Sequence, residues 1–519
     1  ELRDIIKEGV ESWNIAFEKA GFKNAIQVKI QPDTADWDAG DIRYNVLRWT
    51  SSPKPPWGGY GPSFVNPRTG QILGADIMLE WSYITRRIYE NDLFNNVNNI
   101  DQYYCSAAKH QQFETSFGID YIKTFDLDSE MEKELVKQSL YRLVLHEVGH
   151  TLGLNHNFKG STLLSMSEIK DQEIVLEKGL CNSVMEYPAI NIASNIDEQT
   201  LYYDTVPGLY DHWAIEFGYS TFSDSLEKEE LQKILSKSIN PDLAFANDAD
   251  DMRSSGKGID PFAMINDLTN EPVQYSVERM DLIISLIYKL KDKYSIEDES
   301  FQRLKNAFST LLVEYRNCLS TISRQIGGVE VNRSFFDPKM DQNPPFKPID
   351  YINQKEAMSV LSKYIFAQDA FIFPDTVYSY LQSQRRGFGV PFSGEDPKIM
   401  DQILYLQKIT LSQILHQNVL NRINNSSYYG NQYTMEEYFD DLNKVIFNQD
   451  INSSVNYNRQ NLQIFYVEKL LYIMKNSMYN NISKSAAYAN LDWIYKNLNV
   501  KIGNNSSIRH RKYLIYLIS

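Results

Sequence analysis

The sequence predicts an α+β fold for residues 1–222 and a mainly α-helical domain for residues 276–519, with residues 223–275 connecting the two. Three observations lead to this prediction. Short runs that alternate apolar and polar residues predict strands between residues 25 and 81. A long stretch of helical periodicity ends near residue 154, and further such stretches follow residue 276. A chain of 519 residues also exceeds the size that one hydrophobic core supports.

The first part of the chain is expected to form a helix, several strands and a second helix. Apolar residues at helical spacing predict the first helix, which reaches Gly21: Leu2, Ile5, Ile6, Val10, Trp13 and Phe17. The predicted strands span residues 25–30, 42–49, 64–66 and 75–81. A proline-containing loop is expected at 51–62, a turn at 66–70 and a helix at 82–94. No element is assigned to the segment near Cys105.

The second long helix is predicted to begin at Asp128 or Ser129 and to end near Leu154. Acidic residues in its first turns suit the positive end of the helix dipole. Residues 157–182 are expected to form a loop with one short helix, and another helix begins near Asp211. The strongest helical periodicity in the second half covers residues 283–315, 357–371, 400–420 and 462–478.

The stretch from residue 146 to 156 reads HEVGHTLGLNH and predicts a catalytic zinc site. His146 and His150 stand four residues apart, so a helix presents them on one face. Gly153 can take the left-handed conformation that ends a helix sharply, and the turn can then bring His156 back to the first two imidazoles. Three neutral imidazoles with an open fourth position are typical of catalytic zinc. Glu147 lies close enough to act on a water molecule held by the metal.

This pattern resembles the metzincin clan of zinc peptidases, in which the zinc motif is followed by a turn containing methionine, the Met-turn. The segment Ser183-Val184-Met185-Glu186-Tyr187 is similar to that turn. The resemblance implies that Met185 forms a hydrophobic floor beneath the metal. It also implies that Tyr187 steadies the oxyanion of the reaction, although a half-buried aromatic residue packed against the turn would give the same sequence.

Other motifs narrow the resemblance to large bacterial zinc-dependent metalloproteases with a helical C-terminal region. In order along the chain, they are WDAGDIRY at 37–44, YGPS at 60–63, NPRTG at 66–70, ADIML at 75–79, NFKGS at 157–161 and GLYDHWAI at 208–215. The likeness extends to about residue 385 and is thinner beyond 275. It implies a metzincin-like catalytic domain at 1–222, with a mixed twisted sheet, an active-site helix and a Met-turn. Its cleft lies between 1–156 and 157–222.

In the metzincin clan an edge strand lines the cleft, and an extended substrate adds to it as one more strand. The candidate for this rim is the segment 60–65, with Tyr60, Gly61, Ser63 and Val65 as substrate-binding residues. An ordinary sheet edge covered by loops would also explain these residues, and both readings remain open.

The chemistry expected of this site is hydrolysis of a peptide bond in a protein or peptide substrate. One zinc ion would lower the pKa of its water to roughly 7. Glu147 would accept the proton from that water as general base and later pass a proton to the departing amine. Two alternatives remain: a zinc amidase acting on cell-wall or glycosylated peptides, and a non-catalytic binding protein on the same fold. The presence of Glu147 favours an enzyme over a binding protein, because a binding protein needs no base beside the ligands.

Composition limits the partners of the protein. A net charge of −15 argues against a nucleic-acid partner, and no apolar run is long enough to span a membrane. The numbering begins at Glu1 inside a predicted helix, so we expect that a signal peptide, lipid anchor or preceding domain has been removed. We therefore expect an extracytoplasmic location. The oligomeric state is left open.

Two further features allow more than one interpretation. The chain has 3 cysteines: Cys105 and Cys181 could form a disulfide, but free buried thiols fit the sequence equally well, and Cys318 has no assigned partner. An acidic cluster suggests calcium: Asn247, Asp248, Asp250, Asp251 and Asp260. Because Met252 breaks the spacing of a calcium loop, we expect a solvated acidic turn and no calcium.

Overall fold

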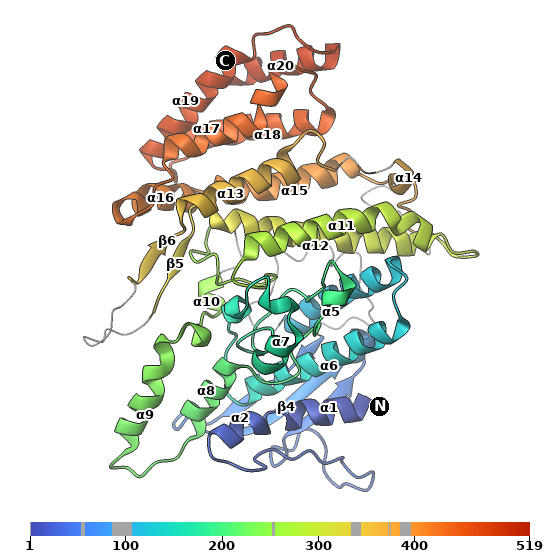
Figure 1. The fold of residues 1–519 in the computed structure, drawn as a ribbon, viewed down its shortest axis with the longest axis vertical. Helices are drawn as coiled ribbons and strands as arrows, with labels where there is room; N and C mark the ends of the chain where they lie inside the picture. Colours follow the sequence, from blue (N-terminus) through green and yellow to red (C-terminus); the bar gives the residue numbers. More distant parts are fainter. Residues whose placement is uncertain are drawn as a thin grey trace. The chain divides into compact units, whose positions relative to one another are not determined.

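The computed structural model describes residues 2–52, 58–85, 106–251, 255–333, 344–371, 373, 375–384 and 396–519 (Figure 1). The chain divides into two compact units. The first contains Glu1–Asp251, Phe262–Leu282 and Ser309–Glu314, and the second contains Met252–Pro261, Ile283–Phe308 and Tyr315–Ser519. The first unit is α+β and the second is mainly helical, so the predicted fold class is confirmed.

The N-terminal helix is present but interrupted. It forms α1 (Leu2–Glu11) and α2 (Asn14–Lys19), with Trp13 between them. The Trp13 side chain is fully buried, and its indole Nε1–H donates to the carbonyl oxygen of Leu145 at 3.2 Å. This hydrogen bond joins the first helices to α6 (Ser129–Thr151), the helix that carries the zinc motif.

The strand predicted at residues 25–30 is wrong, because these residues form no strand. The exposure of the side chains does alternate along this segment, because Ile26 and Val28 are half-buried and their neighbours are exposed. Their backbone groups bond to helix side chains. The side chain of Asn14 binds both the N–H and the carbonyl of Ile26, at 2.9 and 2.8 Å, and Glu11 accepts from the N–H of Val28 at 3.1 Å. Alternating burial therefore arises without a neighbouring strand.

The sheet of the first unit is mixed and is built around one long strand. Its strands are β1 (Val46–Thr50), β2 (Gly59–Tyr60), β3 (Ser63–Val65) and β4 (Ile72–Glu80). β1 runs parallel to β4, whereas β2 and β3 run antiparallel to it on the opposite side. The predicted strands at 42–49, 64–66 and 75–81 thus exist with shifted ends. Residues 53–57, in the predicted loop at 51–62, lie outside the described residues.

The long helix predicted from 128 is α6. Asp128 caps its N-terminus by accepting from the N–H of Glu130 at 3.0 Å, and its first turn is acidic. A helix that was not predicted, α5 (Ala107–Thr124), packs along α6. The helix predicted at 82–94 begins as α3 (Trp81–Thr85), and the remainder of that prediction lies outside the described residues.

After α6 the first unit consists of short elements and loops. They are the 3₁₀ turns η1 (Gly160–Leu163), η2 (Glu168–Lys170), η3 (Ile196–Glu198), η4 (Lys237–Ile239) and η5 (Pro241–Leu243), with the helices α7 (Gln172–Lys178), α8 (Leu209–Tyr219), α9 (Glu227–Ser236) and α10 (Asp248–Asp251). The one short helix expected within 157–182 corresponds to α7, and the helix expected near Asp211 corresponds to α8. Cys181 is a buried free thiol, and burial raises its pKa. Cys105 lies outside the described residues.

Helices fill most of the second unit, in which β5 (Val329–Val331) pairs antiparallel with β6 (Phe346–Pro348). Two helices, α11 (Pro272–Tyr294) and α12 (Gln302–Gln325), contribute residues to both units. The helices that follow them are α13 (Tyr351–Leu361), the π-helical η6 (Ser362–Phe366), α14 (Asp375–Tyr378), α15 (Ile399–Ile414), α16 (Gln417–Ser426), α17 (Met435–Ile446), α18 (Tyr457–Lys475), α19 (Asn481–Asn497) and α20 (Asn505–Ile518). The 3₁₀ turns η7 (Ser427–Tyr429) and η8 (Asn448–Asp450) follow α16 and α17. Figure 1 shows the helices from α13 to α20 in successive layers.

A buried ion pair holds several of these C-terminal helices together. Arg459 Nε lies 2.6 Å from Asp450 Oδ2, and both side chains are almost fully buried. Arg511 donates to the backbone carbonyl of the same Asp450 at 2.6 Å, which connects α20 to the pair. Cys318, on α12, is buried. In the described part of the chain, no helix has the length and apolar content needed to cross a membrane.

Candidate metal centre

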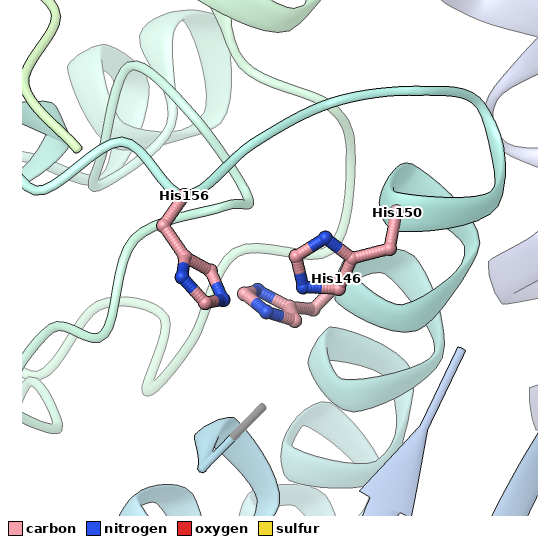
Figure 2. Close-up of side chains that lie close together, drawn as sticks. All are labelled: His146, His150 and His156. Carbon is pink, nitrogen blue, oxygen red and sulfur yellow. The ribbon is translucent and has the colours of Figure 1, made fainter. Parts of the chain in front are cut away.

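The C-terminal half of α6 brings the first two histidines of the motif together. The rings of His146 and His150 have centroids 4.8 Å apart, as expected for side chains one helical turn apart on the same face. Both side chains project from α6 toward the same space (Figure 2). His146 is 1 % exposed, so the site begins in the core of the first unit.

Gly153 ends the helix and turns the chain back. Its φ of 93° lies in the left-handed region that only glycine adopts without strain. Its N–H donates to the carbonyl of His150 at 3.0 Å, and the next N–H, that of Leu154, donates to Gly149 at 3.0 Å. The chain then carries His156 to the other two imidazoles, and Figure 2 shows the three rings gathered from the helix and the following loop.

The three histidines form a group that fits a metal ion, because one ligating atom from each lies within 4.8 Å of the others. Each Nδ1 has an oxygen partner: the Val184 carbonyl at 2.8 Å for His146, the Leu154 carbonyl at 3.1 Å for His150 and Asp248 Oδ2 at 2.8 Å for His156. These oxygens keep the proton on Nδ1, so that the lone pair of each ring is on Nε2. The buried Nε2 of His150 has no hydrogen-bond partner among the described residues, as a ligand without its ion would not.

The protonation of these histidines also suits metal binding. Burial lowers the pKa of His146 well below its usual value and lowers the pKa of His150 to about 4. The neighbouring imidazoles act in the same direction, because a second positive charge nearby disfavours protonation. Both rings are therefore neutral near pH 7, which is the form that donates a lone pair to zinc.

Glu147 lies beside the first histidine, and the glycine backbone of the neighbouring strand packs against it. Its side chain is fully buried. A Cβ added at Gly59 would lie 2.9 Å from Glu147 Oε1, and one added at Gly61 would collide with the Glu147 backbone carbonyl. Both glycines therefore allow the segment around β2 to approach the carboxylate closely.

The segment 183–187 forms a tight turn under the histidines. Asp211, in the first turn of α8, accepts from Ser183 Oγ at 2.6 Å, Val184 N–H at 2.7 Å and Gly208 N–H at 2.8 Å. Met185 is fully buried in this turn. A Cβ added at Gly149 would collide with Met185 Sδ, so the thioether packs directly on the helix between the first two histidines.

Arg142 connects the helix to this turn and was not predicted as a site residue. It lies one turn before His146 and is 2 % exposed. Its guanidinium donates to the carbonyls of Val184 and Glu186. The Val184 carbonyl also accepts from His146, so one backbone oxygen joins the arginine, the histidine and the turn. An arginine on the buried face of a predicted helix was the sequence signal for this role.

Tyr187 places its hydroxyl at the histidine cluster. Its oxygen lies 2.9 Å from Nε2 of His156, and the side chain is 1 % exposed. Its backbone N–H donates to Glu186 Oε1 at 2.7 Å. The ring of His110, on α5, stacks on the tyrosine ring with centroids 5.7 Å apart, and His110 Nε2 lies 2.9 Å from the Pro188 carbonyl. Because α5 was not predicted, His110 could not be recognised from the sequence as a residue near the site.

A small hollow adjoins the centre. The residues that line it come from α5, α6 and the segment after the turn: Ala107, His110, Gln111, Arg142, His146, Glu186, Tyr187, Pro188 and Tyr203. Its lining is mixed, with charged, amide and aromatic side chains next to a potential metal ligand.

The predicted rim residues lie on the edge of the sheet that borders Glu147. Tyr60 pairs with Met78, and Ser63 pairs with Ala75, on β4. Gly61 lies between β2 and β3, next to the Glu147 backbone. Val65 is 48 % exposed. Their role in binding substrate stays a prediction.

In the acidic cluster considered for calcium, several carboxylates form hydrogen bonds with other groups of the protein. Asp248 bonds to His156, and Asp250 Oδ2 accepts from the N–H of Asn247 at 3.0 Å. In the second unit, Asp260 Oδ2 accepts from the N–H of Val331 at 3.1 Å. Nothing in the described residues supports the calcium interpretation.

A comparison with family models identifies one match, described as Met-zincin, over residues 128–454. This range begins at the cap of α6, includes the three histidines and the 183–187 turn, and covers more than half of the chain. No curated protein and no solved structure matches the chain significantly. The family match and the histidine cluster together show that the chain belongs to the Met-zincin family of metzincin-type zinc metallopeptidases.

Proposed function

We propose that the protein is a zinc-dependent endopeptidase in which His146, His150 and His156 hold the metal and Glu147 is the general base. The observation that carries the proposal is the common arrangement of the three imidazoles, each with Nδ1 on an oxygen acceptor. That arrangement puts the lone pair of each ring on Nε2, and one ligating atom from each histidine lies within 4.8 Å of the others. A zinc ion bound there would supply Lewis-acid chemistry, polarising the peptide carbonyl and acidifying a water molecule.

Side chains of the protein carry out the proton transfers and stabilise the oxyanion. Glu147, buried beside the ligands, accepts the proton of the attacking water and returns a proton to the departing amine. Tyr187 directs its hydroxyl to the same space and donates to the oxyanion as negative charge develops. Met185 and Arg142 hold the 183–187 turn against α6, so that the ligand nitrogens stay close to one another.

The substrate in this proposal is an extended protein or peptide segment lying along β2 and β3. Two features support it. These strands form an edge of the sheet, and Gly59 and Gly61 bring that edge against Glu147. Backbone hydrogen bonds from Gly61, Ser63 and Val65 would align a peptide with the base. We also propose that the protein works outside the cytoplasm.

The direct test is a digest of a denatured-proteome peptide library with the purified protein, run beside a peptidoglycan digest. We expect cleavage inside peptides, together with loss of activity after chelation and its return with zinc. A matched sample carrying Glu147→Gln controls for contaminating proteases. Peptidoglycan cleavage without cleavage of library peptides would support the amidase alternative, and removal of single terminal residues would contradict endopeptidase action.

Tyr187→Phe is expected to lower kcat by about 10²–10³-fold, because it removes one donor to the oxyanion and keeps the ring. KM should change little, since the bond is made in the transition state. Met185→Leu, which conserves volume, should cost less than about 1.5 kcal/mol of stability and little activity. The measurements are kcat and KM for both variants, with zinc content and melting temperature.

Tyr121→Phe is the matched control for the tyrosine change. Tyr121 is also buried, and its hydroxyl donates to the Ala193 carbonyl at 3.1 Å. Loss of that bond should cost about 0.5–1.5 kcal/mol of stability without affecting kcat. If Tyr187→Phe matched the parent while Met185→Leu lost activity, Tyr187 would be a packing residue.

A further inference from the structure

Hydrogen bonds attach the segment 244–248 to Asn157 and Phe158, the two residues that follow His156. Ala244 accepts hydrogen bonds from the side-chain amides of Asn157, at 3.0 Å, and Asn182, at 3.2 Å. The N–H of Ala246 donates to Asn157 Oδ1 at 3.1 Å, and its carbonyl accepts from the N–H of Phe158 at 2.6 Å. Asn157 is fully buried, so these bonds are shielded from water.

Asp248 is the last residue of this segment and the first residue of α10. Its Oδ2 lies 2.8 Å from Nδ1 of His156. The side chain of His156 is 11 % exposed and that of Asp248 is 60 % exposed. The carboxylate therefore meets the histidine from the solvent side, and the other ring nitrogen, Nε2, lies 2.9 Å from the Tyr187 hydroxyl.

His156 lacks the helix that carries the other two histidines, and its ring has the hydrogen-bond partners Asp248 and Tyr187. His146 and His150 stand on a regular helix, and their Nδ1 atoms bond to carbonyls of the 183–187 turn and of the helix end. His156 lies on the loop beyond Gly153, where no helix fixes its backbone. Its Nδ1 bonds to a carboxylate that is 92 residues away in the sequence.

We propose that Asp248 is a positioning residue of the metal centre, carried by the segment 244–248. Its carboxylate holds His156 with the proton on Nδ1 and with Nε2 turned toward the other two imidazoles. A charged acceptor on Nδ1–H also makes the ring a better electron donor to a metal. The proposal rests on the metal site of the proposed function and adds a part of the chain beyond residue 222 to it.

The test is zinc affinity, measured on the full chain by competition with a chromophoric chelator after removal of metal. Asp248→Ala should weaken zinc binding by about 10–100-fold, the range found when a partner of a ligand histidine is lost. Asp248→Asn keeps an acceptor oxygen without the charge, so its affinity should lie between those of the parent and Asp248→Ala. The absorption bands of bound Co²⁺ should shift in Asp248→Ala, because the orientation of one ligand changes.

Asp242→Ala is the matched control, since Asp242 is an exposed acid in the same region and its removal changes the net charge equally. It should bind zinc and Co²⁺ as the parent does. His156→Ala provides the reference for loss of the ligand itself. Zinc affinity of Asp248→Ala within twofold of the parent, with weak binding by His156→Ala, would overturn the role of Asp248. Unchanged affinity in His156→Ala would instead overturn the three-histidine site.

Discussion

His150→Ala is expected to leave the purified protein with far less than one zinc per chain and without measurable hydrolysis. His150 is the most diagnostic of the three ligands, because its buried Nε2 has no hydrogen-bond partner in the described part of the chain. Losing a partner of a ligand costs about 10–100-fold in affinity, and losing the ligand itself should cost more. Zinc content by mass spectrometry of the metal and peptidase rates on one sample measure both effects.

His212→Ala gives the control for removal of a histidine. Burial lowers the pKa of His212 to about 4, as it does for His150, but the Nδ1 of His212 lies 2.7 Å from Lys19 Nζ, outside the cluster. This variant should keep its zinc and its activity. A His150→Ala protein with full zinc occupancy and parental rates would exclude the proposed ligand set.

Glu147→Gln is expected to keep zinc and to lower kcat by about 10²–10⁴-fold, the usual contribution of a general base. Glutamine has nearly the same shape, so the close packing of Gly59 and Gly61 against this side chain should survive. KM should stay near the parental value, because the proton transfer occurs only during the chemical step. Steady-state kinetics on a cleaved library peptide, with zinc content measured on the same preparation, provide the comparison.

Glu114→Gln is a matched substitution at another buried acid of the first unit. Burial and the neighbouring Glu314 raise the pKa of Glu114 well above its usual value, so glutamine resembles its protonated form. The parental kcat is expected there. Near-parental kcat in Glu147→Gln would make Glu147 a bystander and would require another base.

The elements that the sequence predicted correctly are those specified by local chemistry. α6 could be placed because its cap at Asp128, its acidic first turn and its periodic apolar face are neighbours in the sequence. The three histidines followed from helical spacing and from one glycine, Gly153. In the second half, periodicity located helices but missed breaks: the stretch at 400–420 divides at His416, whose ring caps α16 by accepting from the N–H of Asn418.

The features that escaped prediction depend on contacts between distant residues. Residues 25–30 alternate as a strand does, yet their backbone partners are side chains of Asn14 and Glu11, which periodicity does not reveal. Arg142 reaches a carbonyl 42 residues away, and His156 bonds to an acid 92 residues away. The family match also extends to residue 454, well beyond the range in which the motifs resemble known metalloproteases.

The contact between Gly149 and Met185 restricts which sequences can encode this site. In the zinc motif any residue is allowed before the second histidine, but in this chain Met185 Sδ lies only 2.4 Å from the point where a Cβ at position 149 would be. Trp13 closes the same space from the other side, with Cζ2 at 3.1 Å from that Cβ position. The residues at positions 13, 149 and 185 therefore share one packing volume, and a larger side chain at one position requires a smaller side chain at another. We expect a mutant library that varies position 149 alone to contain mostly misfolded proteins. A library that varies positions 13, 149 and 185 together should contain other combinations of residues that form the same centre.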